Sequence, residues 1–155
     1  MRELQIRKAE PADATVIGPL VQRAIRTSNA ADYEPALIEM MCANFEPDKF
    51  RARMAARDVF AAVQAGVIIG TVSFSLPRAK LYSLFIEPSI QRGGVGKRLV
   101  HHIEQHAARL GCTDLQLSAS ITAKPFYDRL GYATIRFEER VNDGSTWLMS
   151  KRLGL

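Results

Sequence analysis

The sequence is poor in the features that mark secreted, membrane-spanning or disulfide-stabilised proteins. Its 155 residues include only two cysteines, Cys42 and Cys112, which stand far apart and outside any metal-binding or redox spacing. No apolar run approaches the length that spans a bilayer, and residues 1–10 lack the apolar segment of a signal peptide. We therefore expect a cytoplasmic protein with reduced cysteines and no membrane partner.

The chain also lacks a contiguous basic block, although its formal net charge is +5. No zinc-finger, helix-turn-helix or RNA-binding aromatic signature is present, so we expect no nucleic-acid partner. His102 and His106 are four residues apart on a predicted helix and could chelate a metal there, but no third ligand is apparent. We expect a solvated face or a subunit contact at these histidines, and no metal. Scattered lysines and arginines suit a small polyanionic ligand instead.

Hydrophobic periodicity predicts alternating strands and helices within a single domain over residues 1–155. Apolar residues at helical spacing predict four helices, which begin after Pro11, Pro35, Pro47 and Gly94. A short fifth helix is predicted over 122–130. Alternating or continuous apolar runs predict strands over 4–7, 59–63, 67–76, 81–86, 114–119, 133–140 and 145–153. The order predicts an α/β (mixed α+β) fold, with a mixed sheet of six to seven strands and helices on both faces.

The junction between the 81–86 strand and the helix after Gly94 carries the clearest functional signal. It reads Gln91-Arg92-Gly93-Gly94-Val95-Gly96-Lys97. Glycines let backbone N–H groups approach a ligand closely, and the partial positive charge of the helix N-terminus suits a phosphate or pyrophosphate. A nucleotide P-loop is disfavoured because Arg98 replaces the required hydroxyl residue, and a dinucleotide fingerprint because Leu99 replaces its third glycine.

The motif instead matches Gln/Arg-x-x-Gly-x-Gly/Ala, and the strand before it ends in Leu84-Phe85-Ile86-x-Pro88. A later segment, 123–132, fits Ala-x-x-Phe-Tyr-x-x-x-Gly-Phe/Tyr. With both motifs in this order, the chain resembles the GNAT superfamily of N-acetyltransferases. The resemblance implies acetyl-CoA as cosubstrate and a splayed pair of central strands that admits its pantetheine arm. It implies that the following residues bind the cofactor: Leu84, Phe85, Ile86, Gln91, Arg92, Gly93, Gly94, Val95, Gly96, Lys97 and Phe126. Ser120 stands where many members have an asparagine. Its hydroxyl could bind the pantetheine arm, or it could be a serine that ends the strand or caps the next helix.

Tyr127 is the catalytic candidate, because a tyrosine at this place in the family acts as general acid toward the CoA sulfur. The alternative is an aromatic that packs the helix on the sheet. Full proton transfer from a tyrosine of pKa about 10 to a thiolate of about 8.5 is uphill by roughly 2 kcal/mol, so a hydrogen bond to the thiolate could carry most of the effect. Some members place a glutamate base where this chain has Lys80. A water chain, Glu87 or an amine of low pKa could substitute, and we assign no base.

These residues predict transfer of an acetyl group from acetyl-CoA to a primary amine, by direct attack in a ternary complex. The acceptor is a small molecule or a peptide. Asp32 and Glu34, between the first two helices, could attract a cationic amine, although an exposed helix–helix loop is the simpler interpretation. The alternatives are a non-catalytic CoA-binding sensor or regulatory module, and a nucleic-acid-binding protein. Family members are often dimers, so a homodimer is possible.

Overall fold

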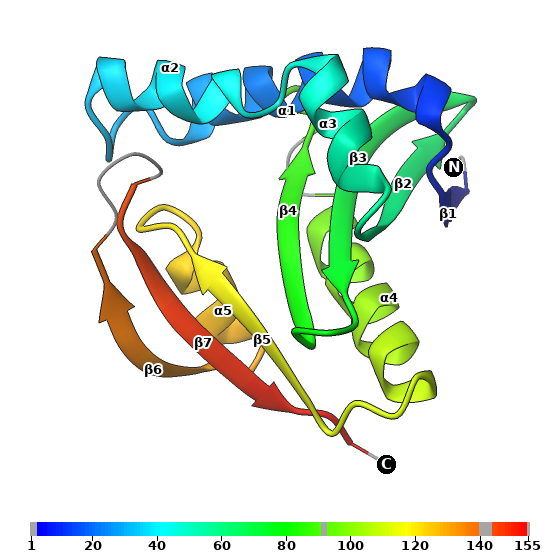
Figure 1. Cartoon of the computed structure of the whole chain (residues 1–155), viewed down its shortest axis with the longest axis vertical. Helices are drawn as coiled ribbons and strands as arrows, with labels where there is room; N and C mark the ends of the chain where they lie inside the picture. The colour runs from blue at the N-terminus through cyan, green and yellow to red at the C-terminus, as the bar shows by residue number, and fades with distance from the viewer. Residues whose placement is uncertain (1–2, 91–92, 140–143, 155) are drawn as a thin grey trace.

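The computed structural model describes residues 3–90, 93–139 and 144–154. Within these ranges the chain forms seven strands, five α-helices and one short 3₁₀ helix (Figure 1). Their order is β1 (Leu4–Lys8), η1 (Pro11–Asp13), α1 (Ala14–Ser28), α2 (Pro35–Ala43), α3 (Pro47–Met54), β2 (Asp58–Gln64), β3 (Val67–Ser75), β4 (Lys80–Ile86), α4 (Val95–Arg109), β5 (Asp114–Ala119), α5 (Lys124–Arg129), β6 (Ala133–Glu138) and β7 (Thr146–Arg152). Every predicted strand and helix is confirmed, with small shifts at the ends.

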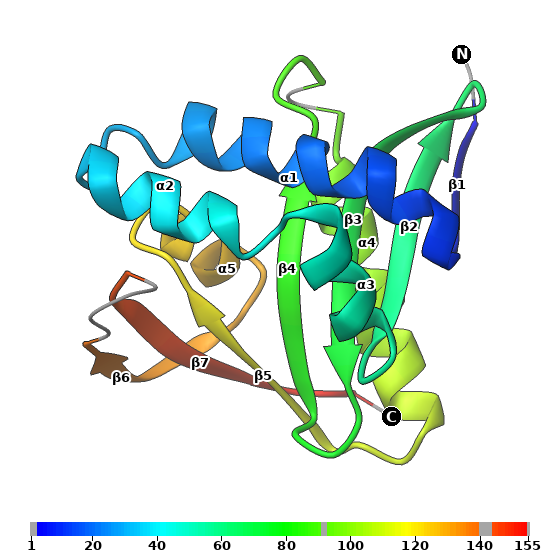
Figure 2. The same ribbon diagram turned by 45° about the horizontal axis from the view of Figure 1, so that its top comes forward.

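The strands form one mixed sheet in the order β1-β2-β3-β4-β5-β7-β6. All neighbours are antiparallel except β4 and β5, which run parallel and pair only at Lys80 with Gln116 and Leu81 with Leu117. Beyond these two pairs the strands diverge and the sheet opens into two halves, as Figures 1 and 2 both show. The predicted splayed central pair is therefore confirmed.

A β-bulge in β4 lies at the point where the strands part. Thr71 of β3 pairs with Phe85, but Ser73 pairs with Tyr82, so β4 carries one more residue than β3 between these pairs. Ser83, within the bulge, has φ of 54°, which a residue with a side chain adopts only at a cost of about 1 kcal/mol. A bulge bends its strand and increases its twist, which turns β4 away from β5.

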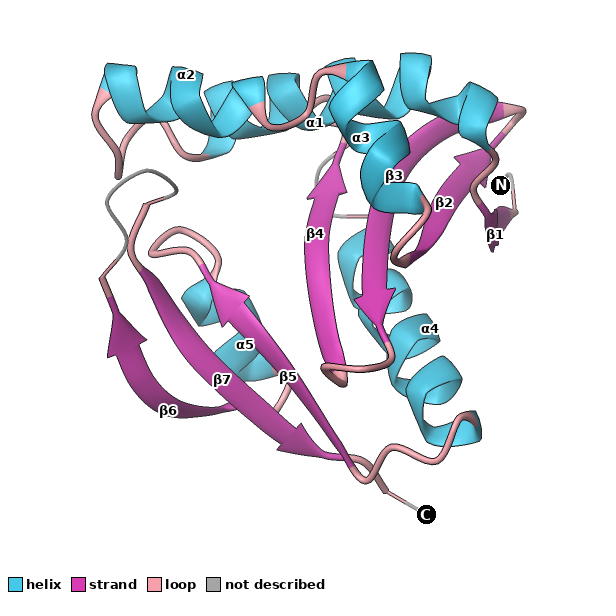
Figure 3. Ribbon diagram, viewed as in Figure 1, coloured by secondary structure: helices cyan, strands magenta, loops and turns pink. Residues whose placement is uncertain are grey.

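Two hydrophobic cores lie on opposite faces of the sheet, because successive residues of a strand point to opposite sides. On β2, Val59 and Ala61 pack with α1, α2 and α3, whereas Phe60 and Ala62 pack with α4. Figure 3 shows α3 and α4 on opposite sides of the sheet. The prediction of helices on both faces is confirmed, and the described helices include none long and apolar enough to cross a membrane.

The histidines of α4 correct one expectation from the sequence. His102 and His106 are partly buried rather than solvated, with their rings 4.5 and 5.2 Å from the ring of Phe60. His106 also lies 2.9 Å from a carboxylate oxygen of Asp58. The helix periodicity placed both residues beside the apolar stripe, but it could not show that β2 supplies an aromatic ring and an acid to cover them.

Candidate active site

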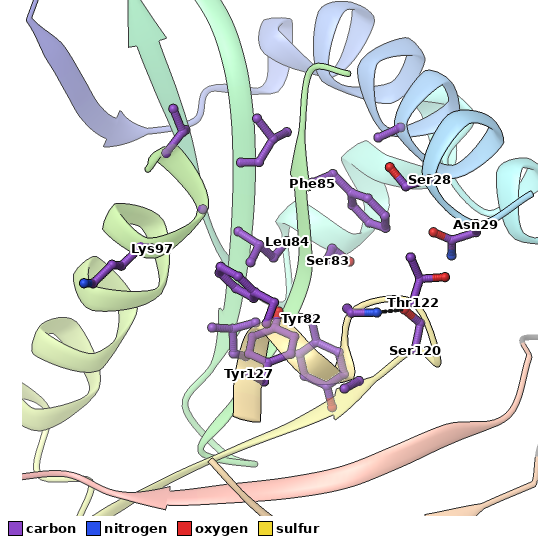
Figure 4. A pocket seen from close by; sticks show the side chains of 18 of the residues that line it. Ser28, Asn29, Tyr82, Ser83, Leu84, Phe85, Lys97, Ser120, Thr122 and Tyr127 are labelled. Carbon is purple, nitrogen blue, oxygen red and sulfur yellow. Dashed lines mark hydrogen bonds between the residues drawn. The ribbon is translucent and has the colours of Figure 1, made fainter. Parts of the chain in front are cut away.

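A cavity of about 680 Å³ occupies the fork between β4 and β5. Four segments form most of its wall: β4 from Leu81 to Ile86, the start of α4 from Gly93 to Lys97, the end of β5 from Ser118 to Ser120, and the start of α5. Residues from α1, α2 and their connection close the far end (Figure 4). All the site residues predicted from the sequence line this cavity except Gln91 and Arg92, which lie outside the described residues.

The start of α4 presents backbone N–H groups to the cavity. Gly94 caps the helix with φ of 72°, a left-handed conformation that glycine adopts without strain. In the first turn, the N–H groups of Val95, Gly96 and Lys97 have no partner within the helix, as at any helix start. A Cβ atom on Gly96 would lie 3.3 Å from Cζ of Phe126, so glycine permits the close approach of α4 and α5 here. This arrangement suits a bound phosphate or pyrophosphate.

The edge of β4 that faces the fork forms a second wall. From Tyr82 onward, β4 has no strand partner on its β5 side within the described part of the chain. Leu84 and Ile86 line the cavity and also pack against the core under α4, whereas the Phe85 ring lies on the other face, 5.6 Å from the ring of Phe45. A ligand arm with amide groups can therefore hydrogen-bond to this edge as an added strand.

Tyr127 lies deep in the fork, with its side chain packed between two other aromatic rings. The ring centroids of Phe126 and Tyr132 are 5.1 and 5.8 Å away, and only 5% of Tyr127 is exposed. Its hydroxyl has no hydrogen-bond partner among the residues that the structure describes. Burial raises the pKa of Tyr127 above its usual value, so the hydroxyl is protonated at neutral pH and available as a donor.

Ser120 and Lys97, two further candidates for binding the cofactor, both line the cavity but face it differently. The Oγ of Ser120 accepts a hydrogen bond from the N–H of Ala123 at 3.1 Å, shown dashed in Figure 4, so this serine caps the turn before α5 while lining the cavity. Lys97 lines the cavity as well, but in Figure 4 its amino group points away from the other labelled side chains.

The connection between α1 and α2 is tied across the far end of the cavity. The Tyr33 hydroxyl accepts a hydrogen bond from the N–H of Ile121 at 2.9 Å and donates one to the carbonyl of Ser145 at 3.1 Å. The Asp32 carboxylate accepts a hydrogen bond from the Thr122 hydroxyl. This carboxylate, which the sequence allowed either to attract a cationic amine or to lie in an exposed loop, therefore holds two loops together. The tie joins residues 88 to 112 positions apart, and no local pattern in the sequence signals it.

Glu87, the one side chain offered above as a base, and Lys80, which stands where some members have a glutamate base, are both absent from the residues that line the cavity. Glu87 follows β4 directly but pairs with the guanidinium of Arg23 at 2.6 and 3.2 Å. The ammonium group of Lys80 lies 5.3 Å from the ring of Tyr82, at the closed end of the fork. Among the described residues that line the cavity, none is an aspartate, a glutamate or a histidine.

Comparisons with known proteins agree with this geometry. A family model described as an acetyltransferase (GNAT) domain matches residues 29–153. The uncharacterized N-acetyltransferase YafP of Escherichia coli (strain K12) is 28% identical over 149 residues, which cover 95% of this chain and 92% of YafP.

Solved structures extend the likeness to the whole fold. The GCN5-related N-acetyltransferase of Rhodopseudomonas palustris has a TM-score of 0.90 at 26% identity, over 96% of this chain and 95% of its own. The PaiA N-acetyltransferase of Thermoplasma acidophilum, solved in complex with coenzyme A, has a TM-score of 0.82 at 19% identity, over 97% and 99%. The chain therefore belongs to the GNAT superfamily and is an N-acetyltransferase.

Proposed function

We propose that the protein transfers an acetyl group from acetyl-CoA to a primary amine by direct attack within a ternary complex. One observation supports this most strongly: a single cavity brings together the amide row at Gly93–Gly96, the unpaired edge of β4 and the buried hydroxyl of Tyr127. The first would hold the diphosphate, the second the pantetheine arm, and the third lies where that arm would end.

Tyr127 would act on the leaving group. As the amine nitrogen forms its bond to the acetyl carbon, the carbon–sulfur bond breaks and the electron pair stays on sulfur. The Tyr127 hydroxyl donates a hydrogen bond to the developing thiolate. Because its raised pKa makes full proton transfer costlier than for an ordinary tyrosine, we expect the hydrogen bond to contribute most of the stabilisation. The thiolate then takes a proton from solvent, directly or through this hydroxyl.

The amine must be uncharged when it attacks. At pH 7 this costs roughly 4–5 kcal/mol for a lysine-like amine of pKa about 10.4, but only about 1 kcal/mol for an α-amine near 8. Glu87 is held by Arg23, so we assign no general base and route the proton of the amine to solvent. This favours acceptors whose amine has a low pKa.

Two measurements test the proposal. Saturating acetyl-CoA should raise the melting temperature, because a ligand that binds only the folded state stabilises it. Release of free thiol should then depend on an added amine, chosen from aminoglycosides, polyamines, amino acids, peptide N-termini and lysine peptides. A shift in melting temperature without thiol release across the panel would favour the CoA-binding sensor. No shift at all would contradict both functions.

A further inference from the structure

Arg57 does not line the cavity itself, but it stacks on a residue that does. It stands in the connection between α3 and β2, is half-buried, and places its guanidinium carbon 3.8 Å from the centroid of the Tyr82 ring. Tyr82 lines the cavity. Arginine stacks on aromatic rings while its five N–H donors remain available for a planar oxyanion, so this arrangement is a common way to present a guanidinium.

The register of the sheet puts Arg57 on the side away from the phosphate loop. Arg57 directly precedes β2, where Val59 faces the core under α1–α3. On β4, Leu81 packs in the core under α4, so its neighbour Tyr82 faces the opposite side. The Arg57 side chain therefore crosses β3 on the face opposite α4. The start of α4, which suits the diphosphate, lies on the other face.

Arg57 also differs in its partners from four arginines of β1, α1 and α3 that pair with acids. Arg7, Arg23, Arg26 and Arg51 each pair with a carboxylate within 3.0 Å. Arg57 has no carboxylate partner among the described residues. Burial lowers the pKa of its guanidinium, an effect that nearby Tyr82 opposes and Arg78 reinforces. A charge that is partly withdrawn from water without an acid beside it is costly unless a ligand supplies the anion.

Two hydroxyls point to a polar ligand on the same face. Ser118 follows Leu117, and Thr146 precedes Trp147; both of these neighbours pack under α4. Because successive residues of a strand face opposite sides, Ser118 and Thr146 face the same side of the sheet as Tyr82. Both line the cavity, and their hydroxyl oxygens are buried without a hydrogen-bond partner among the described residues. Buried polar groups are normally satisfied, so a ligand that reaches this face would supply the missing partners.

We propose that Arg57, held on Tyr82, binds a carboxylate of the acceptor, so the acceptor is an amine that also carries a carboxylate. This inference rests on the proposed acetyl transfer, because it assigns the second substrate of the same cavity. The carboxylate lies on the face of Tyr82, Ser118 and Thr146, and the amine extends into the fork toward Tyr127. The positive charge serves recognition and takes no part in the breaking of the thioester.

The test compares amino acids with their amides, which share the amine-bearing skeleton but differ in the carboxylate and, because of it, in the pKa of the amine. Each substrate is therefore compared between wild type and variant. Wild type, Arg57→Gln, Arg57→Lys and the control Arg51→Gln are assayed for thiol release. Arg51 lies nearby in α3 and pairs with Asp48, so its variant removes one positive charge without touching Tyr82. A shift in melting temperature with acetyl-CoA shows that each variant folds and binds the cofactor. The same acids and amides are also added to the CoA-saturated proteins, and the melting temperature is measured.

We expect acids to stabilise CoA-saturated wild type more than amides do. Loss of a charge-assisted contact should raise the KM for the acids by about 10- to 100-fold in Arg57→Gln, with kcat little changed. Arg57→Lys should recover part of this loss, and Arg51→Gln should behave as wild type. The KM for amides should not depend on Arg57.

Several outcomes separate this inference from the proposed function. If Arg57→Gln affects acids and amides alike, the carboxylate site is wrong while acetyl transfer stands. If no amine releases thiol, yet acids stabilise CoA-saturated wild type and not Arg57→Gln, the anion site is supported and acetyl transfer is wrong. If acids stabilise neither protein more than amides do, the carboxylate site is contradicted.

Discussion

The Tyr127 side chain is positioned by its neighbours rather than by its hydroxyl. The rings of Phe126 and Tyr132 hold it edge-on, and no described residue accepts a hydrogen bond from its oxygen. The Tyr127 hydroxyl can therefore donate a hydrogen bond to a ligand without first losing one to the protein. Its low dielectric surroundings strengthen any hydrogen bond to a developing charge.

Tyr127→Phe tests this role directly. Removing the hydroxyl leaves the packed ring in place, so we expect little change in stability. Loss of one donor to the leaving thiolate should lower kcat about 100-fold, with a small change in the KM for acetyl-CoA. Steady-state thiol release measures both constants. An unchanged kcat with a weakened KM would place Tyr127 among the binding residues instead.

The sequence predicted motif residues that line the cavity, but not the residues around them. Tyr127 and Gly94 belong to local patterns whose spacing is visible along the chain. Tyr33 contacts Ser145 and Arg57 contacts Tyr82. These partners are distant in the sequence, and no short window of sequence contains them. Ser83 was missed for another reason, since a serine at positive φ lacks the glycine signal that marks most such positions.

At the level of elements, β4 and α4 form the site by departing from regular geometry. The bulge turns β4 away from β5, and the left-handed Gly94 ends the preceding loop so that α4 begins beside the fork. The periodicity of the sequence located both elements, because their apolar stripes are regular. It could not reveal the bulge, which depends on how β3 and β4 align.

Gly96→Val tests the approach of α4 to the cofactor. The added side chain would meet the Phe126 ring, which lies 3.3 Å from the first added carbon, and it would crowd the first turn of the helix. We expect the KM for acetyl-CoA to rise at least about 10-fold, from loss of roughly 1.4 kcal/mol of binding. Ala108→Val, on an exposed position of the same helix, controls for helix propensity and should leave this KM unchanged. Equal behaviour of the two variants would contradict the role of Gly96.

Asp13 joins β1 to the start of α1. Its carboxylate accepts hydrogen bonds from the Arg7 guanidinium at 2.8 and 3.1 Å and from the N–H of Glu10 at 2.7 Å. The hydrogen bond from Arg7 lowers the pKa of Asp13; burial opposes this shift, and the Glu10 N–H adds to it. A lowered pKa means that the carboxylate stabilises the fold above its unfolded pKa of about 3.9, and that this stability is lost as the pH falls through the lower folded pKa.

Asp13→Asn should therefore lower the free energy of unfolding by about 1 kcal/mol near pH 7. The difference from wild type should shrink as the pH falls below about 4, because both proteins then carry a neutral group there. Urea unfolding of both proteins between pH 7 and the acid range measures this difference in the free energy of unfolding. Asp48→Asn removes a carboxylate that is 97% exposed and should change little at any pH. A difference that persists in acid would show that Asp13 acts through packing alone.

At the scale of the whole molecule, the two halves of the open sheet are joined at both ends of the fork. Lys80 and Leu81 pair with β5 at the closed end, and Tyr33 connects to Ile121 and Ser145 at the other. A cavity framed in this way can admit an extended ligand between the strands while its far end stays fixed.

Tyr33→Phe removes both hydrogen bonds at the far end while it keeps the ring. We expect a loss of about 1–3 kcal/mol in the free energy of unfolding, because the N–H of Ile121 and the carbonyl of Ser145 both lose a partner. We also expect a higher KM for the amine, with binding of CoA little changed. Denaturant unfolding and titration with CoA measure the two effects. Weakened CoA binding with an unchanged KM for the amine would show that Tyr33 supports the cofactor site rather than the amine site.

The central claim is that the fork between β4 and β5 holds the cofactor. A crystal structure of the protein with CoA tests it most directly. We expect the diphosphate within hydrogen-bond distance of backbone N–H groups between Gly93 and Lys97, the pantetheine amides paired with the edge of β4 at 84–86, and the sulfur beside the Tyr127 hydroxyl. CoA bound elsewhere, with the fork closed or filled by side chains at saturating cofactor, would contradict the account.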